Sequence, residues 1–264
     1  MDLFAFTTDP DVARRVVRAG AAGVVVDWER RGKRRRQAGC DTQINADTPD
    51  ELAAVRAATD GRVLCRVNGW GPWTAGEVDL AVDLGADEVL LPMVRRPEEV
   101  DAALDRVDGR CGLGILVETS DAARRADELL QRPVARVYVG LNDLMIDRGC
   151  GPLFAALVDG TVDRLAERAA GAGIPFGVAG LTVPEGGRPV PCRLLAGELA
   201  RLAASFTFLR RSFHADTAGR DLDDEVPRIL AMMAVARRRD PALVALERAE
   251  LEAAVGLQFE DAAV

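Results

Sequence analysis

The chain has 264 residues, of which 48% are hydrophobic and 29% charged, and its formal net charge is −8. This length is sufficient for one barrel domain of about 250 residues without disulfide or metal staples. The acidic balance argues against nucleic acid as the main partner, because phosphate binding needs a basic face. The sequence shows no apolar run of about 18 residues and no signal-peptide pattern. Together with five scattered cysteines, these features predict a cytoplasmic protein with reduced thiols and no membrane partner.

A single histidine, His214, is present. This excludes a His-rich zinc site and leaves one candidate base for a Ser-His-Asp triad. An enzyme with this composition would depend on carboxylates and arginines. We expect a structural or loop role for His214.

Short runs rich in β-branched residues alternate with amphipathic segments along most of the chain. The expected strands cover residues 3–7, 23–27, 62–68, 88–94, 112–119, 135–142, 175–180 and 206–211, with one short extended piece at 41–45. Expected helices include 97–107, about 121–131, 153–171 and 192–204, and the sequences Asp9-Pro10 and Thr48-Pro49-Asp50-Glu51 are typical helix starts. Eight βα units predict an α/β fold of the (β/α)8 TIM-barrel type. The alternative, a doubly wound open sheet, usually has a G-x-G-x-x-G turn after its first strand, and none is present.

The pattern changes after residue 219, where two helices, 221–239 and 241–254, are expected and no strand follows. We therefore predict a catalytic barrel domain over residues 1–219 and a C-terminal helical extension over 220–264. The extension would pack either on the barrel or on a neighbouring subunit.

Polar residues close several of the expected strands, at the end where barrel active sites lie. Glu118 and Asp143 follow adjacent strands, and two hard oxygen ligands suit Mg²⁺, Mn²⁺ or another divalent metal. Arg66 offers a planar cation to an anionic oxygen. Of Arg210 and Arg211, strand alternation places one inward, where it would bind a second substrate anion; which one is left open. The basic run at 32–37 is expected to be a solvated loop or to cover an anionic tail.

Five motifs occur in the order and spacing of one known family. They are DWE at 27–29 with GK at 32–33, CRVN at 65–68, LLPMV at 90–94, ILVET at 115–119 and VGLND at 139–143. Over roughly residues 3–215 the chain resembles the HpcH/HpaI aldolase and citrate lyase β-subunit family, within the barrels that handle pyruvate and phosphoenolpyruvate.

The resemblance implies that Glu118 and Asp143 bind the metal and that Arg66 binds substrate and stabilises the enolate. It also implies that Asp27 and Glu29 lie near the metal's water molecules as outer partners or acid/base groups, and that the protein is a homo-oligomer, a trimer or hexamer. One departure concerns the aldolase branch, which has a histidine just after the second strand. This sequence has Arg-Arg-Gly at 30–32 instead.

These observations predict a divalent-metal-dependent carbon–carbon lyase. It would act on a 4-hydroxy-2-oxoacid or related hydroxy acid through a pyruvate-type enolate, in the cleavage or the aldol-addition direction. Thr119 and Asn142 would shape the substrate shell. Two alternatives stay open at this point: a citrate- or malyl-type acyl-CoA lyase, and a barrel that binds a ligand without catalysis.

Overall fold

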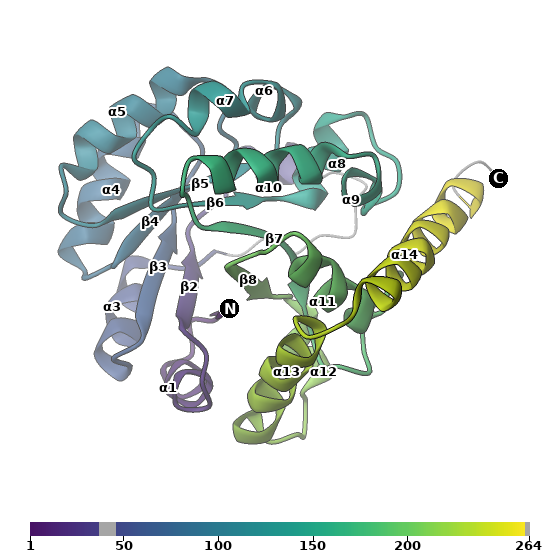
Figure 1. The fold of residues 1–264 in the computed structure, drawn as a ribbon. Helices are drawn as coiled ribbons and strands as arrows, with labels where there is room; N and C mark the ends of the chain where they lie inside the picture. The colour runs from purple at the N-terminus through teal and green to yellow at the C-terminus, as the bar shows by residue number, and fades with distance from the viewer. Residues whose placement is uncertain (37–45, 262–264) are drawn as a thin grey trace.

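The computed structural model describes residues 1–36 and 46–261, in which eight parallel strands form a closed barrel (Figure 1). Each strand pairs with the next, and β8 pairs with β1. The strands are β1 (Asp2–Phe6), β2 (Gly23–Asp27), β3 (Arg62–Arg66), β4 (Glu88–Leu91), β5 (Gly112–Val117), β6 (Arg136–Val139), β7 (Phe176–Leu181) and β8 (Phe206–Leu209). The predicted (β/α)8 barrel is confirmed. The expected extended piece at 41–45 lies outside the described residues.

Helices surround the strands, and two of them begin at the predicted caps. Asp9 accepts hydrogen bonds from the backbone at the start of α1, and Thr48 and Glu51 form a capping box at α3. The helices that precede the sixth strand are α1 (Pro10–Arg18), α2 (Lys33–Arg36), α3 (Pro49–Ala58), α4 (Thr74–Asp83), α5 (Pro97–Val107), α6 (Ser120–Arg124) and α7 (Ala126–Leu129). Those that follow it are α8 (Leu141–Asp147), α9 (Ala155–Val158), α10 (Thr161–Gly171), α11 (Cys192–Arg201), α12 (Ser212–Asp216), α13 (Leu222–Ala236) and α14 (Pro241–Asp261).

Side chains from the strands fill the interior of the barrel. The inner layer contains Phe4, Val25, Leu64, Leu90, Leu116, Phe206 and Phe208. At the amino end of the barrel, Glu88 and Arg136 form a buried ion pair with 2.6 Å between Oε1 and Nε. The continuous apolar strands of the sequence are explained by this arrangement, because parallel strands in a barrel are covered on both faces.

Some element ends differ from the sequence-based expectation, and the differences matter for the site. The sixth strand ends at Val139 and helix α8 starts at Leu141, so Asn142 and Asp143 lie in the first turn of a helix and not on a strand. The eighth strand ends at Leu209, which places both Arg210 and Arg211 beyond it. Strand alternation therefore does not force one of the two arginines outward.

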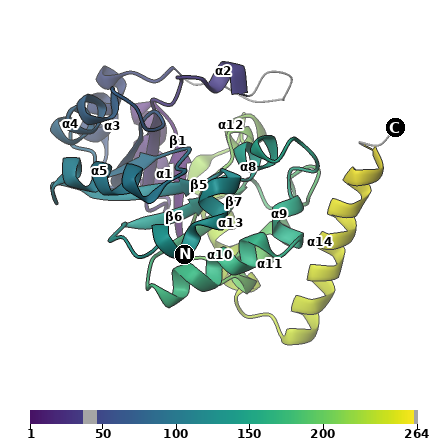
Figure 2. The same cartoon turned by 90° about the horizontal axis from the view of Figure 1, so that it is seen from above.

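The two C-terminal helices pack on the outside of the barrel. Helix α13 contacts α1 and α11, and α14 contacts α11 and α9, with Leu251 and Val255 of α14 buried. Beyond these contacts α14 projects from the body of the molecule in both views (Figures 1 and 2). Among the described residues, no helix is both long and apolar enough to cross a membrane.

Candidate functional site

A cavity of about 520 Å³ lies at the carboxyl ends of the strands. Most of the side chains singled out in the sequence line it, namely Arg66, Glu118, Asn142, Asp143, Arg210 and Arg211. The lining of the cavity also includes Lys33, Tyr138, Phe154 and Arg188, to which no role was assigned from the sequence. This is the end of the barrel at which enzymes of this fold carry out their chemistry.

Glu118 follows β5 and is held in place by backbone geometry. Its Oε1 accepts a hydrogen bond of 2.8 Å from the backbone N–H of Met93, a residue in the left-handed region with φ of 56°. Across the cavity wall, a Cβ on Gly140 would lie only 2.3 Å from Glu118 Oε2. Because glycine alone leaves that space, residue 140 is part of how the carboxylate is positioned.

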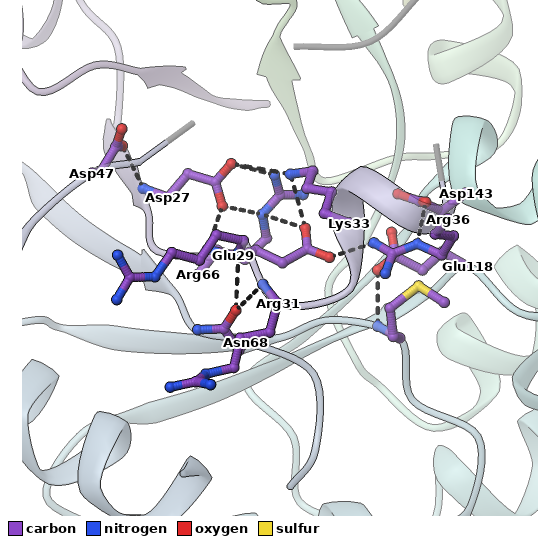
Figure 3. Close-up of polar contacts among 12 residues, drawn as sticks. Asp27, Glu29, Arg31, Lys33, Arg36, Asp47, Arg66, Asn68, Glu118 and Asp143 are labelled. Carbon is purple, nitrogen blue, oxygen red and sulfur yellow. Dashed lines mark hydrogen bonds and ion pairs between the residues drawn. The ribbon is translucent and has the colours of Figure 1, made fainter. Parts of the chain in front are cut away.

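Asp143 lies in the first turn of α8, on the next unit of the barrel. Its Oδ1 accepts a hydrogen bond of 2.7 Å from Arg36 Nε (Figure 3). Burial, together with the nearby charges of Asp143 and Glu29, raises the pKa of Glu118 from its ordinary 4.5 to about 8. A bound cation would offset the repulsion between these buried carboxylates.

The donor set fits a hard divalent cation, with the two carboxylates as protein ligands and oxygens of water and substrate completing the shell. In the described part of the chain, no group of three or more His, Cys, Asp and Glu side chains is arranged to hold a metal by itself. A site with two protein carboxylates that keeps its remaining positions for a substrate is the arrangement Mg²⁺ commonly takes in enzymes.

Arg66 ends β3 and forms a two-point ion pair with Asp27 at the end of β2. Its Nε lies 2.8 Å from Asp27 Oδ1, and its Nη2 lies 2.6 Å from Oδ2. These strands are paired with Asp27 opposite Arg66, which explains the alignment. Within the described residues, Nη1 of Arg66 makes no hydrogen bond, and the side chain lines the cavity, so both N–H groups of Nη1 are left for a ligand.

Three cations converge on a single oxygen of Asp27. In addition to Arg66, Arg211 Nη2 lies 3.2 Å and Lys33 Nζ 3.4 Å from Oδ2. Burial by itself would raise the pKa of Asp27, but the three cations outweigh it and hold the pKa well below its usual range. Asp27 is therefore ionised throughout the neutral range, and its geometry is that of an anchor for Arg66.

Glu29 shares two of its cationic neighbours, Lys33 and Arg66, with Asp27. It is 1% exposed and lies 3.0 Å from Lys33 Nζ and 2.6 Å from Arg36 Nη2 (Figure 3). The basic run was expected to be a solvated loop, but its side chains at 33 and 36 point into the site as part of α2. The spacing of Glu29 and Lys33 could have indicated this contact in the sequence, because oppositely charged residues four positions apart can pair.

Two of the expected substrate-shell residues have different surroundings. Thr119 is fully buried, donates to the carbonyl of Val94 and accepts from the backbone N–H of Ala122. It caps α6 and does not line the cavity, contrary to the expectation of a substrate contact. Asn142 does line the cavity.

Arg210 and Arg211 both line the cavity and have separate environments. Arg211 belongs to the cation group at Asp27. Arg210 donates from Nε to the carbonyl of Gly180 at 2.9 Å and lies 5.5 Å from the ring centre of Phe154. No carboxylate of the described chain lies within ion-pair distance of Arg210, and its buried Nη2 has no hydrogen-bond partner there.

His214 does not line this cavity. Its Nε2 lies 2.6 Å from the carbonyl oxygen of Phe6 in β1. Since a carbonyl only accepts, Nε2 carries the proton and donates. The histidine thereby ties α12 to the first strand.

Comparisons with known proteins agree with this fold. The chain is similar to the solved structure of an HpcH/HpaI aldolase from Desulfitobacterium hafniense DCB-2, with 17% identity and a TM-score of 0.62 over 83% of this chain and 89% of that one. It is also similar to an HpcH/HpaI aldolase/citrate lyase family protein from Burkholderia cenocepacia J2315, with 16% identity and a TM-score of 0.60 over 78% of this chain and 86% of that one. It is similar in the same way to the citrate synthase SbnG (17% identity, TM-score 0.61, covering 83% and 89%). At such identities the likeness shows the fold alone. Among curated proteins, no match is found.

A sequence profile supplies the family. The profile named HpcH/HpaI aldolase/citrate lyase matches residues 1–152, more than half of the chain. This range contains Asp27, Glu29, Arg66, Glu118 and Asp143, the residues that the structure brings to one end of the barrel. By this match the chain belongs to the HpcH/HpaI aldolase/citrate lyase family, a family of lyases.

Proposed function

We propose that this chain is a divalent-metal-dependent carbon–carbon lyase that acts on a 4-hydroxy-2-oxoacid, or a related hydroxy acid, through a pyruvate-type enolate. The observation that carries the proposal is that Glu118, Asp143 and Arg66 line the same cavity. A bound divalent cation would supply Lewis acidity to the keto and carboxylate oxygens of a 2-oxoacid. Glu118 and Asp143 would hold that cation, and the raised pKa of Glu118 supports the need for positive charge there.

Arg66 would stabilise the negative charge that develops on the enolate oxygen. Asp27 and Glu29 outweigh the effect of burial and raise the pKa of Arg66 above its ordinary value, so the guanidinium stays charged. Its orientation is fixed by the two-point contact with Asp27, which leaves Nη1 for the substrate. A donor oriented before the reaction needs no reorganisation when charge appears, and this is the physical basis of such stabilisation.

The two carboxylates expected to assist proton transfer are not equally suited to it. The depressed pKa of Asp27 makes that group a poor proton acceptor, so we assign it the positioning of Arg66. Glu29 remains a proposed acid/base group; it does not itself line the cavity, but its Oε2 lies 3.0 Å from Nζ of Lys33 and 3.6 Å from Nε of Arg66, which do. Arg210 and Asn142, which also line the cavity, would bind the part of the substrate that leaves as the carbonyl partner.

Calorimetric titration of Mg²⁺ and Mn²⁺ into EDTA-treated protein tests the metal site. We expect Glu118→Gln to weaken binding by more than the roughly 10- to 100-fold typical of outer-sphere partners. The control is Glu98→Gln, which changes an exposed carboxylate in the first turn of α5 and should leave the affinity as it is. Equal affinity of Glu118→Gln and the unaltered protein would rule out the proposed ligand.

The reaction class is tested by supplying free 4-hydroxy-2-oxoacids and malyl- or citramalyl-CoA in parallel, with released products followed by coupled assay. Metal-dependent release of pyruvate from the free acids is the expected result. Turnover of the thioesters alone would replace the aldolase by an acyl-CoA lyase.

A further inference from the structure

Lys33 is the only lysine in the chain. The sequence has 34 Lys and Arg residues, and every one of them except residue 33 is arginine. This single primary side-chain amine is not on the surface, where lysines usually lie, but is 1% exposed and on the wall of the active-site cavity. A chain that uses arginine for every other cationic side chain therefore has its single lysine amine on the wall of the cavity that holds Arg66 and Glu118.

The surroundings of Lys33 distinguish it from a simple ion-pair partner. Its Nζ lies 3.0 Å from Glu29 Oε2 and 3.4 Å from Asp27 Oδ2. That same Asp27 oxygen is contacted by Arg66 at 2.6 Å and by Arg211 at 3.2 Å. The ammonium group is therefore one of three cations around one carboxylate oxygen, beside the guanidinium that would bind the enolate.

Of these three cations, only the lysine can release a proton under ordinary conditions, because guanidinium groups remain protonated in proteins. Burial and the positive charge of Arg66 and Arg211 lower the pKa of Lys33, and the carboxylates of Asp27 and Glu29 oppose this, with a net lowering from the ordinary 10.5. These four side chains come from β2, the loop after it, β3 and the turn before α12, and among the described residues they are the charged groups that act most strongly on the amine.

We propose that Lys33 is the group that moves the substrate proton, in the place of the histidine that the sequence lacks after its second strand. This inference rests on the proposed function. As the free amine, Lys33 accepts the proton of the C4 hydroxyl while the C3–C4 bond breaks and its electron pair forms the enolate beside Arg66. The resulting ammonium then returns that proton to C3, which yields the methyl group of the 2-oxoacid. One proton moves from oxygen to carbon, and no oxidant or reductant is needed.

The single lysine makes a direct measurement possible. Protein labelled with lysine carrying ¹³C at Cε gives one side-chain signal, whose titration reports Lys33 alone. We expect a midpoint below that of lysine in a short peptide in the unaltered protein, and a rise of the midpoint in Arg66→Gln, which removes one neighbouring cation. A midpoint equal to or above the peptide value would overturn the proposal.

Activity is tested with Lys33→Ala and Lys33→Arg. Loss of a positioned acid/base typically lowers the rate by about 10²- to 10⁴-fold, and Lys33→Arg should be as inactive as Lys33→Ala although it keeps the charge. Added primary amines of small volume should restore turnover to Lys33→Ala in proportion to their basicity, and should not restore Arg66→Ala. Near-normal turnover in Lys33→Arg, or Lys33→Ala within twofold of the unaltered rate, would contradict proton transfer by this residue.

Two further experiments distinguish proton transfer by Lys33 from imine chemistry on Lys33 and from failure of the proposed metal-dependent function. Borohydride reduction in the presence of pyruvate should leave the mass of the protein unchanged, and a reduced adduct on Lys33 would overturn proton transfer in favour of imine chemistry. If EDTA leaves turnover intact, the metal-dependent function fails, while the titration and amine-rescue results still decide the role of Lys33. If Lys33→Ala does not fold, Lys33→Arg and the titration of the unaltered protein decide it.

Discussion

Asp27→Asn is the substitution that tests the charge arrangement of the site most severely. Asp27 is completely buried and is contacted by three cations, Arg66, Lys33 and Arg211. An asparagine keeps the size of the side chain but removes the negative charge that all three cations contact. The cations are then left close together, with Glu29 as the nearest remaining carboxylate to Arg66 and Lys33.

The expected loss of folding free energy is large. Breaking a buried ion pair by removal of one partner typically costs about 3–5 kcal/mol, because a charge is left buried without compensation. Domains have about 5–15 kcal/mol of stability in total, so the variant should still fold but at a clearly lower denaturation midpoint. Part of the loss should be recovered when Lys33→Met is added, because this removes one of the uncompensated cations.

Urea denaturation of the EDTA-treated protein measures the effect, with the midpoint and slope fitted separately. The matched control is Asp11→Asn, which removes a carboxylate that pairs with Arg14. Because the side chain of Asp11 is 82% exposed, this change should lower the free energy of unfolding by about 1 kcal/mol or less. The reasoning is refuted if Asp27→Asn is no more destabilising than Asp11→Asn, or if the added Lys33→Met lowers stability as much as it does in the unaltered protein.

Three further predictions concern Gly140, Arg66 and Glu118, which also line the cavity. Gly140→Ala should weaken divalent-cation binding, because its Cβ would lie 2.3 Å from Glu118 Oε2 and must displace that carboxylate; calorimetry that shows unchanged affinity would contradict this. Arg66→Lys should lower kcat/KM by at least about 10-fold, since an ammonium cannot keep the two-point contact with Asp27, and a rate near normal would argue against the need for that geometry. In EDTA, the stability difference between the unaltered protein and Glu118→Gln should change with pH. The folded-state pKa of Glu118 is raised from 4.5 to about 8, so its contribution is fully present below pH 4.5 and is lost as the pH rises through 8. The slope between these values approaches about 1.4 kcal/mol per pH unit for one proton, and a flat difference would show that Glu118 titrates normally.

The regular part of the fold followed from local sequence patterns. Each strand is a short apolar run with a helix-sized segment after it, and the N-cap of α1 and the capping box of α3 depend only on neighbouring residues. The ends of β6 and β8 did not follow. The apolar run of β6 continues to Leu141 although the strand ends at Val139, and no turn residue separates Leu209 of β8 from Arg210, so only hydrogen bonding to adjacent strands determines where pairing stops.

The site was predictable where strand ends carry charge and not elsewhere. Arg66 ends β3, Glu118 directly follows β5, and Asp143 lies four residues beyond the end of β6, and a barrel brings all these strand ends to one face. Lys33 and Arg36 come from a short helix after β2, and burial of a basic run depends on carboxylates that lie elsewhere in the chain, such as Asp143. Thr119 stands at a strand end like the others, but its hydroxyl is used to cap α6, a role that sequence position does not distinguish from substrate binding.

The proposed enolate site is tested by exchange of the methyl protons of pyruvate in D₂O, followed by proton NMR. The reaction needs only the enolate of the 2-oxoacid and no knowledge of the carbonyl partner. We expect exchange that requires Mg²⁺ or Mn²⁺, stops with EDTA and is absent in Glu118→Gln. Exchange that proceeds equally in EDTA, or equally in Glu118→Gln, would contradict a metal-assisted enolate site at Glu118, Asp143 and Arg66.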